Sequence, residues 1–149
     1  MITGQKAAGE FKPRRDFVTE ETLLEHSEDR GLSRASLVFA CGNGMGSREN
    51  CDRARAAAER FGAAFGLTRP GALNAWGSTQ EILGQSGLQI SPRCCLVLGA
   101  AGAGAFLLGV QGAKTLIAVN RDEHALIFRH ADYGIVMDAM EFLKKLGKE

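Results

Sequence analysis

The sequence has little of what would tie it to nucleic acid or to a metal ion. Its 149 residues hold 18 Lys and Arg against 17 Asp and Glu, so no basic excess is available for a phosphate backbone. One Trp, one Tyr and eight Phe leave few aromatic surfaces on which single-stranded bases stack. The four cysteines and three histidines have no metal-ligand spacing, so we expect no metal site and interpret the cysteines as reduced and buried.

Long apolar runs are missing as well. The N-terminal sequence lacks the roughly 7–15-residue apolar stretch of a signal peptide, and no segment approaches the ~20 apolar residues of a membrane span. We therefore predict a cytoplasmic chain without membrane insertion. Residues 1–21 are polar, which indicates an arm or linker remnant, and a short capped helix is expected over Thr19–His26. Residues 22–149 are expected to form one α/β domain, because domains commonly have about 100–150 residues.

Apolar runs along the rest of the chain predict parallel strands joined by helical crossovers. They are nearly continuous in apolarity, as expected for strands covered on both faces. The runs are Ser36–Cys41, Cys94–Leu98, Thr115–Val119 and Tyr133–Met137, with a fifth, weaker strand expected near Thr68–Asn74. A helix ended by Gly66 is expected over Glu49–Phe65, where apolar residues recur at helical spacing. The predicted fold is a three-layer α/β sheet with Rossmann-like crossovers.

Glycine-rich segments follow two of these strands, where ligands bind in an open parallel sheet. The first, Gly42–Asn50, matches neither a dinucleotide fingerprint nor a P-loop, so a tight turn and a phosphate site both remain open. The second, Gly99–Gly109, favours a pyrophosphate site, because small residues leave backbone N–H groups accessible. Close packing of a helix on a strand is the alternative there. Gly84–Gly87 predicts a polar turn.

Polar residues also stand at the ends of the later strands. Asn120 and Asp138 each follow an apolar run, where a carboxylate accepts hydrogen bonds from ribose hydroxyls or caps a helix. The histidines have no Ser or Cys partner in a recognisable nucleophile motif. We therefore name no catalytic residue, and we interpret Asp132 and Tyr133 as structural residues at the entry of a strand.

Taken together, these segments resemble the C-terminal, FAD-binding domain of the electron transfer flavoprotein alpha subunit. The resemblance runs from about Ser36 to Met140, and the matching segments keep their order and spacing. They are Cys41–Asn50, Leu67–Arg69, Leu83–Gly87, Gly99–Ala103, Ala118–Asp122 and Ile127–Asp138. The resemblance implies a parallel α/β sheet with FAD lying across the carboxyl ends of its strands.

The resemblance also implies roles for individual residues. The diphosphate would be held by Thr68 and the backbone of Ala101, Gly102, Ala103 and Gly104, and the adenosine end by Asn120 and Asp138. The isoalloxazine and ribityl side would be lined by Leu83, Gly84, Gln85 and Ser86, with the Ser86 hydroxyl near flavin N5. Arg69 corresponds to the family's arginine beside the flavin ring, where a fixed positive charge favours the reduced, negatively charged flavin.

Three positions depart from the family's pattern. Asn43 stands where the family usually has Arg, and Ile82 stands where it usually has Gln. Phe106 replaces the His that donates a hydrogen bond to the flavin pyrimidine carbonyl. Losing a hydrogen bond to a charged group costs about 1.5–3 kcal/mol, which for one electron corresponds to at most about 60–130 mV. Asn43 and Phe106 are included among the expected cofactor-binding residues.

The function implied by the resemblance is an FAD-binding electron-transfer domain that carries electrons between a dehydrogenase and an acceptor. The family's alpha subunit has a further domain, and its beta subunit completes the surroundings of the flavin. A beta-like subunit and a flavin dehydrogenase are therefore the expected partners. An electron carrier is favoured over an enzyme with its own substrate. The three departures leave open an alternative, a nucleotide-binding or assembly module that has lost flavin redox function.

Overall fold

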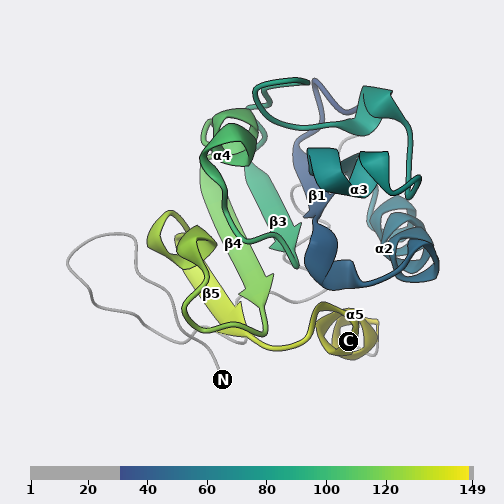
Figure 1. Cartoon of the computed structure of the whole chain (residues 1–149), viewed down its shortest axis with the longest axis vertical. Coiled ribbons are helices and arrows are strands. Elements are labelled where there is room, and N and C mark those ends of the chain that lie inside the picture. Colours follow the sequence, from purple (N-terminus) through teal and green to yellow (C-terminus); the bar gives the residue numbers. More distant parts are fainter. Residues whose placement is uncertain (1–30, 148–149) are drawn as a thin grey trace.

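The computed structural model describes residues 31–147, so the expected arm over residues 1–21 and helix over Thr19–His26 lie outside the described residues. The described strands form one parallel sheet in the order β2-β1-β3-β4-β5 (Figure 1). They are β1 (Leu37–Cys41), β2 (Ala64–Leu67), β3 (Cys94–Leu98), β4 (Thr115–Asn120) and β5 (Tyr133–Val136). The predicted α/β fold with a parallel sheet is confirmed.

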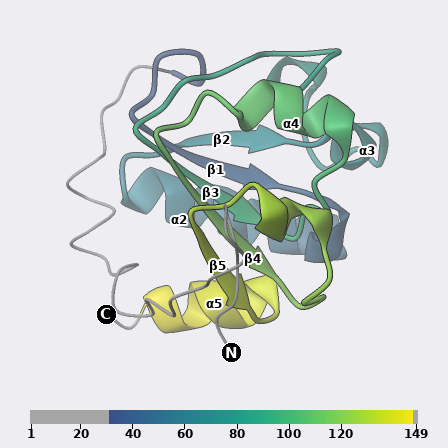
Figure 2. The same cartoon turned by 90° about the vertical axis from the view of Figure 1, so that its left-hand side faces the viewer.

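Helices cover both faces of the sheet. The α-helices are α2 (Arg48–Arg60), α3 (Arg69–Leu73), α4 (Gly104–Val110) and α5 (Ala139–Leu146), and the 3-10 turns are η2 (Asn43–Met45), η3 (Thr79–Glu81) and η4 (Leu126–Arg129). Figure 2 shows α2 and α5 on one face of the sheet and α4 on the other, which gives the expected three layers. No helix within residues 31–147 is long and apolar enough to cross a membrane.

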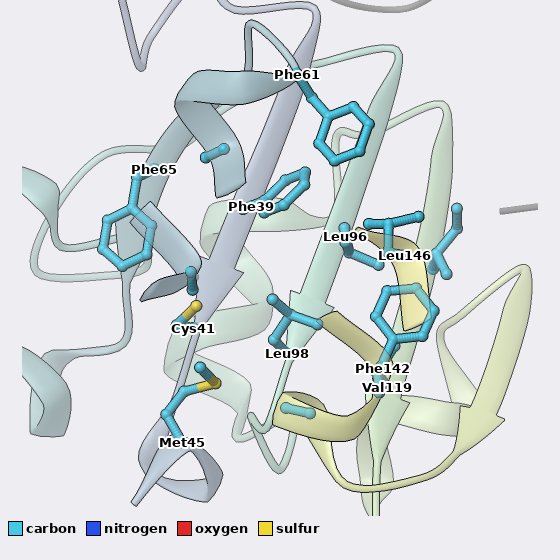
Figure 3. Packing of buried hydrophobic residues seen from close by; sticks show 14 of the residues in the cluster. Phe39, Cys41, Met45, Phe61, Phe65, Leu96, Leu98, Val119, Phe142 and Leu146 are labelled. Carbon is cyan, nitrogen blue, oxygen red and sulfur yellow. The ribbon is translucent and has the colours of Figure 1, made fainter. Parts of the chain in front are cut away.

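Alternate residues of the strands supply two hydrophobic cores, because successive side chains of a strand point to opposite faces. On the face covered by α2 and α5, Phe39 packs against Phe61 with ring centroids 6.2 Å apart. Figure 3 shows Phe142 of α5 on the same side of the sheet as Leu96 and Leu98 of β3. On the opposite face, Val97 shares a core with Phe106 of α4. Burial on both faces explains why the strand sequences are apolar without a break.

The fifth strand and the end of the long helix were predicted wrongly. The helix ends at Arg60 because Gly62 adopts a left-handed backbone with φ of 72°, a conformation that terminates helices. Phe65 and Gly66 therefore belong to β2 rather than to the helix end. The segment expected as a strand near Thr68–Asn74 is mainly the short helix α3, which carries a proline in its first turn, where helices tolerate it.

The cysteines match their interpretation as buried, reduced residues. Cys41, Cys51, Cys94 and Cys95 are all buried and free. Burial raises the pKa of Cys51 to about 11 and that of Cys94 to about 12. Their thiols are therefore protonated at neutral pH and are poor nucleophiles.

The packing predicts how strongly the core depends on Phe39. Replacing this fully buried ring in Phe39→Ala should lower the free energy of unfolding by about 3–5 kcal/mol, because it removes apolar contacts and leaves a cavity. Leu108→Ala is the control, since this side chain is 39% exposed on α4. Urea unfolding followed by circular dichroism measures both, and equal losses in the two variants would contradict the assignment of the core.

Candidate functional site

The strand register brings three loops together at one edge of the sheet. Cys41 at the end of β1 pairs with Leu67 of β2 and with Leu98 of β3. The residues that follow these strand ends are therefore neighbours in space, although they are far apart in the sequence. β1 and β3 flank the point at which the strand order reverses, which is where open α/β sheets bind ligands.

A cavity of about 740 Å³ opens at this edge, within the range of about 300–1,000 Å³ that ligand sites span. It gathers residues from the end of β2, from the 83–86 segment and from the loop between β3 and α4. The expected site residues that line it are Asn43, Thr68, Arg69, Leu83, Gln85, Ser86, Ala101, Gly102, Ala103 and Phe106. Gly84 and Gly104 are neighbours of these residues in the chain but do not line the cavity.

Beside the cavity, the backbone of the loop after β1 packs directly on the backbone of the loop after β3. Gly44 N donates a hydrogen bond to Gly99 O at 2.7 Å, which ties the loop after β1 to the loop after β3. Gly99 has φ of 69°, and a Cβ on it would lie 2.9 Å from the carbonyl carbon of Gly44. A side chain is therefore excluded at this position by both backbone conformation and space.

The 83–86 segment forms the opposite wall and is attached at two points. Leu83 N donates to Leu67 O at 2.9 Å, and Gln85 N donates to Ala105 O at 2.8 Å. The first bond joins the wall to the end of β2, and the second joins it to α4. Between them, Gly84 has φ of 128°, so an L side chain is disfavoured there.

Thr68 presents an orphaned hydroxyl at the cavity. The residue is only 9% exposed, and its Oγ1 has no hydrogen-bond partner among the described residues. Thr68 also occupies the N-cap of α3 without using its side chain to cap that helix. A buried polar atom without a partner is unfavourable, so this hydroxyl has hydrogen-bonding capacity that a bound molecule or water can use.

The two residues expected at the adenosine end do not line the cavity. Asn120 Nδ2 donates to Ala100 O at 3.1 Å, and its Oδ1 accepts from Asp122 N at 2.9 Å. Asp138 Oδ2 accepts from the backbone of Met140 and Glu141, at 3.1 and 3.2 Å, and so caps α5. Of the two roles left open for Asp138, the structure contains the helix cap.

The three departing positions differ in where they lie. Asn43 is exposed at the rim of the cavity, whereas Phe106 is 5% exposed and contributes to its lining. Ile82 is buried in a bridge to Leu67 and is not among the lining residues. Phe106 therefore makes part of the lining apolar.

Other parts of the sequence interpretation gain a structural explanation. The Gly42–Asn50 segment is largely a turn that its own side chains hold together. Ser47 Oγ accepts from Asn50 N at 3.1 Å, and Asn50 Nδ2 donates to Met45 O at 2.7 Å. Asp132 is structural, as expected, since its Oδ2 accepts from Leu116 N at 2.8 Å.

Sequence reasoning missed three residues that line the cavity, namely Pro70, Ala100 and Ala105. Each is adjacent in the chain to an expected residue or to a glycine of the expected site. Adjacency to those segments was the available signal, but small apolar side chains carry no chemistry that would single them out.

Comparison with known proteins gives consistent results. The model of the family described as the electron transfer flavoprotein FAD-binding domain matches residues 31–111. Protein FixB of Salmonella typhimurium is 37% identical to the chain over 126 residues, and Protein FixB of Escherichia coli O9:H4 is 36% identical over the same length. Each match covers 84% of this chain and 40% of the relative, so the chain spans less than half the length of these proteins.

The backbone contact between Gly44 and Gly99 predicts opposite effects on stability when alanine replaces two different glycines. Gly99→Ala should lower the free energy of unfolding by about 2–4 kcal/mol, through left-handed strain and the collision with Gly44. Gly104→Ala is the matched control, since a Cβ there meets no atom within 4 Å and alanine favours the helix by up to about 1 kcal/mol. Urea unfolding of both variants measures the difference, and an unchanged Gly99→Ala variant would refute the contact between Gly44 and Gly99.

Proposed function

The chain belongs to the electron transfer flavoprotein alpha family, and from this premise we propose that its α/β domain binds FAD and carries electrons. The observation that supports the proposal is the cavity at the strand ends, in which Thr68, Arg69 and Ser86 occur together. When bound, FAD would supply the redox chemistry by accepting and returning electrons. The chain's own residues would bind and orient it and set its charge environment.

The residues of the cavity fit such a group. The orphaned Thr68 hydroxyl would donate to a diphosphate oxygen, which gives this buried atom the partner it lacks among the described residues. The first N–H groups of α4 have no acceptor within the helix, and the small residues Ala101–Gly104 leave the backbone close to the cavity. Gln85 and Ser86 are exposed along the opposite wall and would bond the polar edge of the flavin.

Arg69 would supply the positive charge at this site. It is exposed, and it is the one charged side chain among the described residues that line the cavity. A fixed guanidinium charge stabilises negative charge that arrives on a neighbouring group during reduction. Arg69 would therefore raise the reduction potential of the flavin as well as strengthen its binding.

The same lining favours a carrier over an enzyme with its own substrate. Among the described residues that line the cavity there is no Asp, Glu, His, Lys or Cys. General acid–base catalysis relies mainly on those side chains, and a hydroxyl nucleophile such as Ser86 or Thr68 would need one of them as its base. Electron transfer needs only a bound, oriented flavin and an approach for the partner.

The partners proposed are a beta-like subunit and a flavin dehydrogenase. One side of the cavity is accessible, because four of its lining residues are exposed: Asn43, Arg69, Gln85 and Ser86. A beta-like subunit would complete the surroundings of the cavity on this side. The dehydrogenase would deliver electrons, which the chain would pass to an acceptor. Asn120 and Asp138 are proposed at the adenosine end, with Asn120 acting through its bond to Ala100 O.

A second candidate function is a nucleotide-binding or assembly module without flavin redox chemistry. The observation that favours it is Phe106, whose buried ring puts an apolar group in the cavity lining. Titration with ADP and with FAD separates the two candidates. A nucleotide-binding module binds both with the same affinity and an assembly module binds neither, whereas an FAD site binds FAD more tightly because the flavin adds contacts.

The orphaned hydroxyl predicts that Thr68→Val separates stability from ligand affinity. Valine has nearly the same shape, so the ligand-free variant should be as stable as the wild type or slightly more stable, because no hydrogen bond to any of the described residues is lost. Its FAD affinity should fall about 10–150-fold, as expected for losing one hydrogen bond to a charged diphosphate. Flavin fluorescence titration and thermal unfolding measure the two quantities.

The control for this test is Arg93→Gln, an exposed residue just before β3 at the opposite edge of the sheet, which should leave FAD affinity unchanged. The titrations are made with the chain alone and with a candidate beta-like subunit. A wild-type chain that takes up no FAD in either setting would overturn the proposed function.

Arg69 predicts a change in reduction potential. In Arg69→Gln the one-electron potential of the flavin should fall by about 10–40 mV, since an exposed charge stabilises the reduced flavin by about 0.2–1 kcal/mol. The direction follows because removing positive charge disfavours the more negative, reduced form. Spectroelectrochemical titration measures it, with Arg93→Gln again as the control. A potential that stays the same or rises in Arg69→Gln contradicts the proposed place of this charge.

A further inference from the structure

A second hollow, of about 870 Å³, lies beside α2 and β2 and contains none of the expected site residues. Its lining includes Arg55 of α2, Phe65 of β2, and Trp76 and Glu81 of the segment between α3 and the cavity wall. Its importance lies in the side chain of Arg55, which crosses from the helix to that segment.

Arg55 makes contacts with three different parts of the chain. Its Nη1 lies 2.7 Å from Asp52 Oδ1, and its Nη2 lies 3.0 Å from Glu81 Oε1. Nη2 also donates to Trp76 O at 3.3 Å. The guanidinium carbon stacks 4.4 Å from the centroid of the Phe65 ring. A planar guanidinium is suited to this combination of hydrogen bonds and ring stacking, which an ammonium group cannot reproduce.

Glu81 completes the arrangement, which we name the Arg55–Glu81 clamp. Its Oε1 accepts from Ser78 N at 3.0 Å as well as from Arg55, and Ser78 and Glu81 form a capping box around η3. The side chains of Arg55 and Glu81 are 29% and 24% exposed, so water and salt screen the pair only in part. Burial lowers the pKa of Arg55, but the bonds to Glu81 and Asp52 raise it more, so Arg55 keeps its charge.

The clamped segment leads directly into the wall of the cavity. Ile82, the residue after Glu81, bridges to Leu67, and Leu83 N then donates to Leu67 O. Leu67 immediately precedes Thr68, so both sides of the cavity meet at this point. A shift of Glu81 therefore reaches Leu83 and Gln85 within a few residues.

Two features of the segment between α3 and the cavity wall indicate that its path depends on its contacts. Ala75, at its start, has φ of 63°, a left-handed backbone that an alanine adopts only at a cost in energy. Gly77 is packed so closely that a Cβ on it would lie 2.9 Å from Arg55 Nη2. Backbone hydrogen bonds from Ala75 N to Ala72 O and from Trp76 N to Gly71 O close the end of α3. The Arg55 side chain adds the contacts that hold Trp76 and Glu81 against α2.

We propose that Arg55 is a positioning residue for the candidate flavin site, because the Arg55–Glu81 clamp holds the Leu83–Ser86 wall in the arrangement that receives the ligand. The inference rests on the proposed function, but Arg55 does not line the cavity. It acts through Glu81 and the backbone, at a distance from any bound group.

The experiment uses Arg55→Gln in the full 149-residue chain, with two readouts. Hydrogen exchange of the peptide covering residues 79–88, measured without ligand, should become about tenfold faster, while exchange in β3 and β4 stays the same. FAD binding, measured by flavin fluorescence with the beta-like subunit present where binding requires it, should weaken about tenfold, because the apparent Kd rises as the competent wall is less populated. Arg55→Lys should show smaller changes in both readouts than Arg55→Gln, since lysine keeps the positive charge but lacks the planar set of N–H donors of a guanidinium.

Arg48→Gln is the matched control, because Arg48 is on the same helix and lies 3.9 Å from the same Asp52 but has no bond to Glu81 or Trp76. It should change neither readout. Glu81→Gln tests the other partner, and the double variant Arg55→Gln/Glu81→Gln should be no worse than either single one. Glu81→Gln also provides the test if Arg55→Gln does not fold.

The outcomes distinguish a failure of the Arg55–Glu81 clamp from a failure of the proposed function. Unchanged exchange in residues 79–88 overturns the clamp, and so does unchanged FAD affinity in Arg55→Gln when the wild type binds FAD. A uniform rise in exchange over the whole chain also overturns it, because that result indicates general loss of stability. If the wild type takes up no FAD, the proposed function fails, and the exchange readout still decides by itself whether Arg55 holds the wall.

Discussion

The close contact between the loops after β1 and β3 is the constraint on which the site depends. Gly44 and Gly99 approach through their backbones, and the register of the sheet places Thr68 next to the end of β1, where its N–H donates to Cys41 O. A side chain at either glycine would push the two loops apart and separate the parts of the cavity. The glycines at this edge are thus explained first by packing, and the access they give to a ligand is a consequence of that packing.

Much of this arrangement could be predicted from the sequence, because the signals are local or periodic. Unbroken apolar runs identified β1, β3, β4 and β5, and the glycine segments identified the edge at which the cavity lies. The failures occurred where one pattern fits two structures. Ala64 and Phe65 continue the helical spacing of α2 and also suit a strand, and only the left-handed Gly62 decides between the two.

The contacts around Arg55 could not be predicted in the same way. Arg55 and Glu81 are 26 residues apart, and nothing in their local sequence distinguishes them from other exposed charges on a helix and a loop. Their pairing exists only because β2 returns beside β1 and brings the segment after α3 against α2. The orphaned Thr68 hydroxyl is similar, since only its surroundings show that no atom of residues 31–147 satisfies it.

The scarcity of charge in the cavity has a consequence for how a flavin site of this kind would work. With Arg69 as the one charged lining residue among those described, neutral donors and backbone N–H groups must supply most of the binding. Neutral donors change little in energy between the oxidised and reduced ligand, whereas a fixed charge discriminates strongly between them. Redox tuning would therefore rest mainly on Arg69, whereas Arg69 and the neutral groups would share the binding. Changes in Thr68 or in the wall would alter occupancy, and changes in Arg69 would alter the potential.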